Sequence, residues 1–205
     1  ATVDGEKIYV STDAGATWSP KGSDANWKSI ACSADGSKLI AAIGGGQIML
    51  SPDGGETWTA SGTLADGAGE IGNRNWAAVA SSSDGSRLAA AESGGQVYSS
   101  SDSGATWRRH DTGRRQWNAL AMSADGSILI AAPLQGFMAT SKDGGASWIG
   151  FSYGTSFNFA GVACSADGKR VVAVNQISEF PAFEGRAGQV FCSEDSFETF
   201  SERQI

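Results

Sequence analysis

The chain has few of the residues that build metal sites, disulfides or membrane spans. Its 205 residues include three cysteines and one histidine. No apolar run approaches the roughly 20 residues that cross a bilayer. Cys32, Cys164 and Cys192 lie far apart in the sequence, without the spacing of a zinc site. No asparagine is followed by the x-Ser/Thr of a glycan acceptor. We therefore expect no metal, no cofactor, and buried free thiols that pack as small hydrophobes.

The balance of charges excludes another group of functions. The chain has 15 Lys and Arg against 22 Asp and Glu, a net charge of −7. This balance argues against broad binding to nucleic acid or to a membrane surface. Only four prolines stand against 28 glycines, which fits many short strands joined by tight turns.

One short motif occurs five times. The copies are STDAGATW (11–18), SPDGGETW (51–58), SSDSGATW (100–107), SKDGGASW (141–148) and the degenerate SEDSFETF (193–200). The motif aspartates are 40, 49, 41 and 52 residues apart. A period of this length between strand-like segments predicts a repeat fold, and in particular a β-propeller.

Each repeat reads as four antiparallel strands. The first begins with an aromatic residue, as in WKSIAC (27–32), WAAVAS (76–81), WNALAM (117–122) and FAGVAC (159–164). An Asp-Gly turn then leads to an apolar return strand, because Gly36, Gly85, Gly126 and Gly168 can take the positive φ of a tight hairpin. A glycine-rich loop, a third strand, the Asp motif and a fourth strand follow. The sequence thus predicts an all-β propeller of four-stranded blades.

The pattern S-x-D-x-G-x-[TS]-W, once per blade, resembles the Asp-box (BNR) repeat. That repeat occurs in sialidases, sortilin-type receptors, some glycoside hydrolases and the photosystem II assembly-factor propellers. The resemblance implies that the Asp boxes lie opposite the ligand-binding face and are structural, and it favours an extracytoplasmic location. The residues that it makes structural are Asp13, Trp18, Asp53, Trp58, Asp102, Trp107, Asp143, Trp148 and Asp195.

The repeat fills the chain from end to end, so we expect one propeller domain over residues 1–205. Counting back from Ser11 places residues 1–3 at the close of a second strand, so the first of five blades is incomplete. We expect a fragment of a longer chain, or a blade completed by another segment or by a partner. A signal peptide would lie upstream.

Binding residues are expected in the loops that differ between repeats. The predicted inter-blade loop 108–116 holds Arg108, Arg109, His110, Arg114 and Arg115. Arg74 and Arg186 fall on loops of the same predicted face. Guanidinium groups suit carboxylates, sulfates and phosphates. The segment is either a solvated loop or a site for an anion or an acidic protein segment, and His110 is interpreted as a surface residue rather than a catalytic one.

A carbohydrate-binding surface is the alternative. Phe151, Tyr153 and Phe183, in two neighbouring predicted loops, could stack on sugar rings. Phe159, by contrast, is expected to be the core aromatic that opens its blade. This class would respond little to salt, whereas docking through arginines would weaken as salt rises.

A sialidase-like glycosidase is the third possibility. The resemblance would require an arginine in an F/Y-R-I-P motif and a tyrosine activated by a glutamate, and no F/Y-R-I-P occurs here. Tyr9 and Tyr98 are expected beside Asp boxes, and no glutamate is near Tyr153 in the sequence. Glu92, Glu179 and Glu184 are unremarkable candidates for a carboxylate pair. We therefore predict a non-enzymatic recognition propeller with a protein, anionic or glycan partner.

Overall fold

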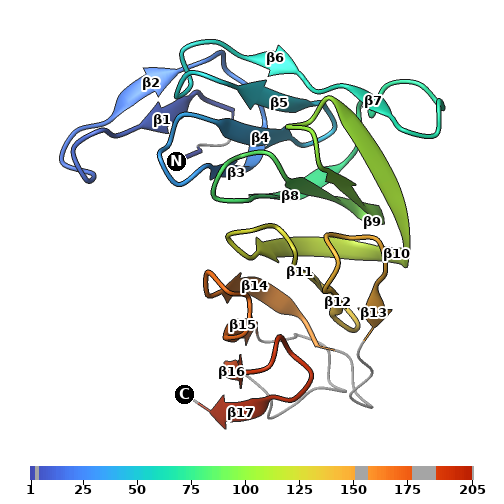
Figure 1. Cartoon of the computed structure of the whole chain (residues 1–205). Helices are drawn as coiled ribbons and strands as arrows, with labels where there is room; N and C mark the ends of the chain where they lie inside the picture. The colour runs from blue at the N-terminus through green and yellow to red at the C-terminus, as the bar shows by residue number, and fades with distance from the viewer. Residues whose placement is uncertain (3–4, 151–156, 177–187, 205) are drawn as a thin grey trace.

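The computed structural model describes residues 1–2, 5–150, 157–176 and 188–204. Every element in these ranges is a β-strand. The sheets follow one another along an open arc, with the N-terminal sheet at one end and the C-terminal sheet at the other (Figure 1). The predicted all-β propeller is confirmed.

Three of the sheets correspond to single blades. Blade 1 is a two-stranded sheet of β1 (Ile8–Val10) and β2 (Ser19–Lys21). Blade 2 contains β3 (Trp27–Cys32), β4 (Leu39–Ile43), β5 (Ile48–Ser51) and β6 (Thr59–Ala60). Blade 5 contains β14 (Phe159–Cys164), β15 (Val171–Asn175), β16 (Gln189–Ser193) and β17 (Ser201–Gln204). In both four-stranded sheets each strand pairs antiparallel with the next.

The long strand β10 (Thr106–Met122) belongs to both blades 3 and 4 and joins them into one seven-stranded sheet. Its members are β7 (Thr63–Leu64), β8 (Trp76–Ser81), β9 (Leu88–Ser100), β10 (Thr106–Met122), β11 (Leu129–Pro133), β12 (Ala139–Ser141) and β13 (Ile149–Gly150). The first part of β10 pairs with β9 and closes blade 3, and the part from Trp117 pairs with β11 and opens blade 4.

This continuity corrects the prediction of an inter-blade loop at 108–116, and that of a glycine-rich loop between the second and third strands of blade 3, which would fall at residues 93–96. Both segments belong to strands, β9 and β10. Gly94 and Gly113, with φ of 81° and 73°, bend the backbone, and the pairing resumes after register shifts around Arg115. The bends replace open loops because glycine takes positive φ without steric cost.

The predicted first strands at 27–32, 76–81 and 159–164 coincide with β3, β8 and β14. The glycines of the four Asp-Gly turns have φ between 67° and 71°, as the hairpins require. Phe159 is 1% exposed and opens β14 as the expected core aromatic.

Backbone hydrogen bonds tie the turns of successive blades into one face. The inner turns of blades 2 to 5 are linked by Ala34 N to Ser83 O, Ser83 N to Ala124 O and Ala124 N to Ala166 O, at 2.7–2.8 Å. The Asp-box turns of blades 2 to 5 each join the inner turn of their own blade, as in Gly54 N to Ser37 O and Gly144 N to Ser127 O. We call this the Asp-box face. Because the strands are antiparallel, the connections from second to third strand lie at the other end, the loop face.

The core lies between the blades. One cluster joins Ile40 and Ile48 of blade 2 to Trp76 and Trp107 of blade 3, and a second joins Ile130 of blade 4 to aromatic residues of blade 5. Each of these contacts buries the face of one sheet against the next. The apolar surface of the blades is therefore removed from water by stacking, as in other repeat proteins.

The Asp-box tryptophans pack toward the preceding blade. How deeply each one is buried therefore depends on whether a blade precedes it. Trp107 is 0% exposed, whereas Trp18 is 51% exposed because no described sheet precedes blade 1. Trp58 and Trp148 are half-buried, so burial between the sheets is complete only at Trp107. The expectation of buried thiols is wrong for Cys32, which is exposed at a pocket between blades 1 and 2.

Candidate functional site

The Asp boxes are closed hydrogen-bonded turns. In the second box, Asp53 Oδ1 accepts hydrogen bonds from Ser51 Oγ (2.8 Å) and Thr57 N (2.9 Å), and Oδ2 accepts one from Thr57 Oγ1 (2.6 Å). The Trp58 indole N–H donates to Gly55 O at 3.0 Å. The same carboxylate bonds recur at Asp13, Asp102, Asp143 and Asp195.

These bonds stabilise the ionised carboxylates. Hydrogen bonds from the Ser147 hydroxyl, the Ser147 amide and the Ser141 hydroxyl lower the pKa of Asp143 to about 2. The equivalent bonds from Thr199 and Ser193 do the same for Asp195. Both oxygens of each carboxylate are occupied within the turn, which fits the structural role that the resemblance implied. Among the described residues no group of acids, cysteines and histidine could hold a metal ion.

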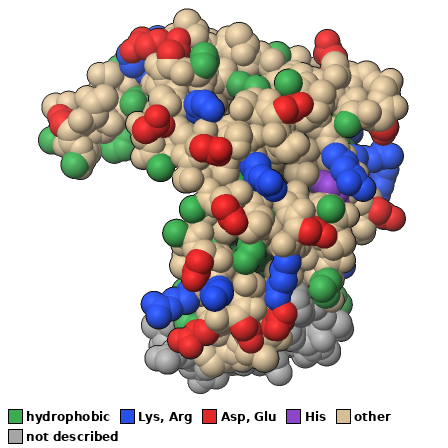
Figure 2. All heavy atoms as spheres, viewed as in Figure 1, with side chains coloured by type: hydrophobic (Ala, Val, Ile, Leu, Met, Phe, Trp, Pro, Cys, Tyr) green, Lys and Arg blue, Asp and Glu red, His purple; other side chains and the backbone are tan. Residues whose placement is uncertain are grey.

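The arginine-rich segment is divided by its strand geometry. Side chains alternate between the two sides of β10, so Arg108 and His110 share one side and Arg109 lies on the other. Arg108, Arg109 and Arg114 are exposed, and Arg115 is half-buried. The single cluster expected from the sequence is therefore separated into groups with different surroundings. Figure 2 shows basic side chains gathered around the only histidine of the chain.

His110 is buried, which corrects the expectation of a surface position in a loop. It is 5% exposed, and its Nε2 lies 2.7 Å from Ser99 Oγ on the neighbouring strand β9. Its ring packs against Trp148 of blade 4 at 6.0 Å between centroids. Burial, and then the charge of Arg108, lower the pKa of His110 to about 4, so the imidazole is neutral at pH 7.

Arg115 is held by its own fold. Its guanidinium donates to the carbonyl oxygen of Phe137, in the connection between β11 and β12, and lies 5.3 Å from the centroid of the Trp117 ring. Burial lowers its pKa. These contacts anchor the end of blade 3 to the loop face of blade 4.

Arg74 belongs to a group that the sequence analysis did not recognise. Its Nη1 lies 3.7 Å from Glu92 Oε2 and its guanidinium 5.2 Å from the centroid of the Tyr98 ring, while the Tyr98 hydroxyl donates to Glu92 Oε2 at 3.2 Å. The bend of β9 between Glu92 and Tyr98 brings the acid and the phenol together. Their spacing on either side of a glycine-rich turn could have predicted this contact. Tyr98 lies on β9 beside the third Asp box, as expected, and its hydroxyl is directed to Glu92. Burial, and then Glu92, raise its pKa.

Four predicted site residues, Arg186, Phe151, Tyr153 and Phe183, lie outside the described residues. No helix in the described part of the chain is long and apolar enough to cross a membrane.

Comparison with known proteins agrees with this geometry. The BNR/Asp-box repeat family matches residues 9–20, which contain the first Asp box. No curated protein matches the chain. A structure described as YCF48 bound to D1 peptide aligns with 97% of this chain and 75% of its own, at 17% identity and a TM-score of 0.59. YCF48 from Cyanidioschyzon merolae aligns over 96% of this chain and 78% of its own, at 12% identity and a TM-score of 0.57.

Glycoside hydrolases share the fold as well. The GH74 xyloglucanase from Xanthomonas campestris aligns with 97% of this chain, at 14% identity and a TM-score of 0.67. The chain spans only 34% of that enzyme. The family match is limited to the first Asp box, and the structural neighbours show the β-propeller fold. Propellers of this shape include one that is bound to a peptide and others that are enzymes.

Proposed function

We propose that this chain is a non-enzymatic recognition propeller that docks an acidic protein segment on an arginine surface formed by Arg74, Arg109 and Arg114. The observation that carries the proposal is the exposure of Arg109 and Arg114, neither of which has an ion pair with a described residue. An unpaired guanidinium retains its full capacity for bidentate bonds to a carboxylate. The peptide held by the YCF48 propeller supports protein docking as the use of this fold.

Neighbouring contacts keep Arg74 and Arg109 in one region, and Arg114 follows Arg109 on the same strand, β10. The charges of Arg74 and Arg109 both act on the Tyr98 phenol. Arg114 directly precedes Arg115, which is anchored to Phe137 and Trp117. A surface with its backbone fixed in this way loses little conformational entropy on binding. Arg186, which the sequence places on a loop of the same predicted face, lies outside the described residues and is not part of this surface.

The test is binding of a labelled peptide rich in Asp and Glu, measured by fluorescence anisotropy at low and high salt. An Arg109→Ser/Arg114→Ser variant should bind at least about tenfold more weakly at low salt, because charge-assisted bonds are lost. The matched control is Lys169→Ser/Arg170→Ser, which removes two exposed charges from an inner turn on the Asp-box face. If both variants bound the peptide more weakly to the same extent, the proposal of a specific arginine surface would be refuted.

A carbohydrate-binding function is the second candidate, favoured by the GH74 propellers with the same fold. It would use Phe151, Tyr153 and Phe183. Affinity electrophoresis in gels containing xyloglucan tests it, since binding by ring stacking should persist at high salt. A glycosidase of the sialidase type is less well supported, because burial and Glu92 raise the pKa of Tyr98 and weaken it as a nucleophile.

A further inference from the structure

A second, polar pocket lies on the Asp-box face, between blades 3 and 4. It has a volume of about 340 Å³ and combines residues of β9 and β10 with the Asp box of blade 4. We call it the blade 3–4 pocket. Its polar lining residues are Arg87, Ser99, Ser100, Ser101, Thr106, Arg108, His110 and Asp143. Both blades that form it are within the described residues, so its walls do not depend on the ends of the chain.

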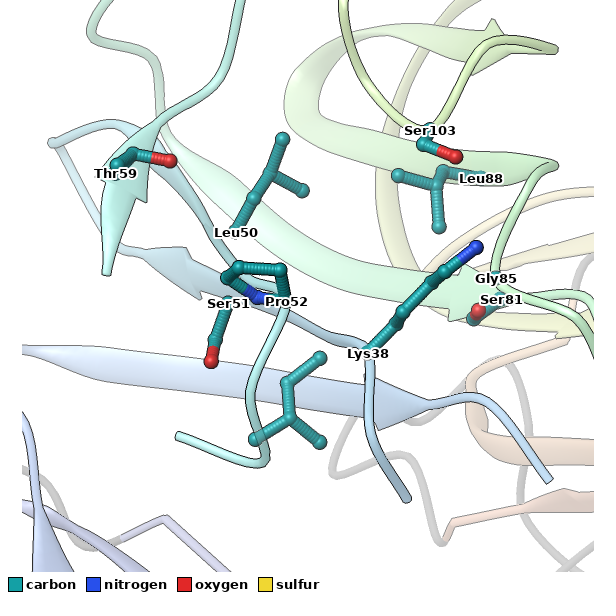
Figure 3. A pocket seen from close by; sticks show the side chains of 10 residues that line it. Lys38, Leu50, Ser51, Pro52, Thr59, Ser81, Gly85, Leu88 and Ser103 are labelled. Carbon is teal, nitrogen blue, oxygen red and sulfur yellow. The ribbon is translucent and has the colours of Figure 1, made fainter. Parts of the chain in front are cut away.

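The repeats supply an internal comparison for this pocket. The equivalent pocket between blades 2 and 3 has a volume of about 240 Å³ and is largely apolar. Figure 3 shows Leu50 and Leu88 directed into it from β5 and β9. Counted from each Asp box, the pairs of equivalent positions are Lys38 and Arg87, Leu50 and Ser99, Thr59 and Arg108, and Ser61 and His110.

Packing alone does not require the polar residues. Leu50 covers Gly104 so closely that a Cβ on this glycine would lie 2.6 Å from Leu50 Cδ1. In the next repeat, Ser99 and His110 cover Gly145, where a Cβ would meet Ser99 Oγ at 3.0 Å and His110 Nε2 at 3.1 Å. A leucine would fill this space and gain from burial, so the pair of half-buried Ser99 and buried His110 needs another explanation.

The charge of the pocket is suited to an anion. Arg87 and Arg108 have no ion pair with any described residue, although both line the same space. Asp143 also lines the pocket, but its oxygens already accept bonds from Ser141 and Ser147 within its own turn. Two guanidinium groups without counter-ions thus face a space that contains one internally bonded carboxylate.

His110 and Ser99 add a directed hydroxyl. The neutral imidazole can carry its proton on Nε2, in which case it donates to Ser99 Oγ and leaves the Ser99 O–H free to donate into the pocket. Arg87 directly precedes β9, which begins at Leu88, and Arg108 lies on β10, so donors converge from different segments of blade 3. Donors spread in this way match the oxygens of a tetrahedral group better than a planar carboxylate.

We propose that the blade 3–4 pocket binds a phosphate group, held by Arg87 and Arg108 and by the Ser99 hydroxyl that His110 orients. The volume leaves room for a substituent on the phosphate, so both free phosphate and a phosphorylated side chain share the chemistry. This site is on the side of β10 that carries Arg108 and His110. It does not depend on the docking function of Arg109 and Arg114.

The test uses the only histidine as reporter. The imidazole NMR signals of His110 are followed at pH 7 and constant ionic strength while inorganic phosphate, phosphoserine or acetate is added. A saturable shift with phosphate or phosphoserine is expected. Tighter binding of phosphoserine would assign the site to phosphorylated side chains, and tighter binding of inorganic phosphate to the free ion. Acetate that binds as tightly as both would overturn the proposal, as would no saturable shift.

Substitutions that introduce the residue found at the equivalent position of the neighbouring repeat should leave the fold intact. Arg108→Thr introduces the residue that occupies the equivalent position 59, and it should weaken phosphate binding at least about tenfold. Arg109→Thr removes the same charge from the other side of the strand and should change the affinity less than about twofold. Equal loss in both variants would mean that the anion responds only to net charge, and would refute the assigned site.

Discussion

Two tryptophans at the same position of the repeat, Trp107 and Trp18, share the hydrogen bond to the motif glycine but differ in burial. Trp107 is fully buried, and its indole N–H donates to Ser61 Oγ at 2.6 Å and to Gly104 O at 3.1 Å. Trp18 is 51% exposed and donates only to Gly15 O, at 3.2 Å. Replacing each with alanine isolates the contribution of the preceding blade.

The magnitude follows from the buried area. A buried tryptophan removes about 150–250 Å² from water. At about 25 cal/mol per Å² this is worth about 4–6 kcal/mol, and tryptophan-to-alanine substitutions in cores cost about 3–5 kcal/mol. We expect Trp107→Ala to lower the free energy of unfolding by about 4 kcal/mol. Trp18→Ala should cost about 2 kcal/mol or less, because half of its surface is already in water.

Urea unfolding followed by far-ultraviolet circular dichroism measures both variants. The two midpoints are compared only if the slopes of the transitions agree, since a changed slope would indicate loss of cooperativity between blades. A Trp107→Ala variant that is no less stable than Trp18→Ala would show that the blades do not stack as described.

Two further predictions concern charged residues. Arg115→Ala should lower the free energy of unfolding by about 1–3 kcal/mol through loss of its bonds to Phe137 and Trp117, whereas Arg114→Ala should change it by less than about 0.5 kcal/mol in the same unfolding assay. The imidazole of His110 should titrate near pH 4, below its ordinary value of 6.5. Between these values the unfolded chain binds the proton that the folded chain excludes, so stability should fall as the pH falls. His110→Ser, which restores the residue found at position 61, should flatten this part of a melting-temperature profile, and an unchanged profile would contradict the assignment.

The sequence predicted the strands best where two local signals agreed. At 27–32, 76–81 and 159–164 an aromatic residue opens an apolar run and an Asp-Gly turn closes it, and the observed strands have the same bounds. Hairpin turns depend on local backbone preferences that glycine supplies. These parts of the fold could be derived without knowledge of neighbouring blades.

The prediction failed where pairing with another strand decides the structure. Residues 108–116 contain arginines and a glycine and were interpreted as a loop, but β9 offers a complementary edge and the segment pairs with it. The burial of His110 is likewise a property of blade 4, whose Trp148 and Gly145 cover it. Such tertiary contacts override the composition of a short segment.

The alternation along β10 gives one basic segment two separate roles. Arg108 lines the blade 3–4 pocket with His110, while Arg109 acts on Tyr98 from the opposite side of the strand. Replacing all four arginines of the segment at once would remove both surfaces and also the anchor that Arg115 provides. A loss of binding in that variant could come from the loss of either surface or of the anchor, and the experiment would not separate the three. Only single substitutions on known sides of the strand can separate peptide docking from phosphate binding, and the neighbouring repeat supplies the residues that the scaffold already tolerates there.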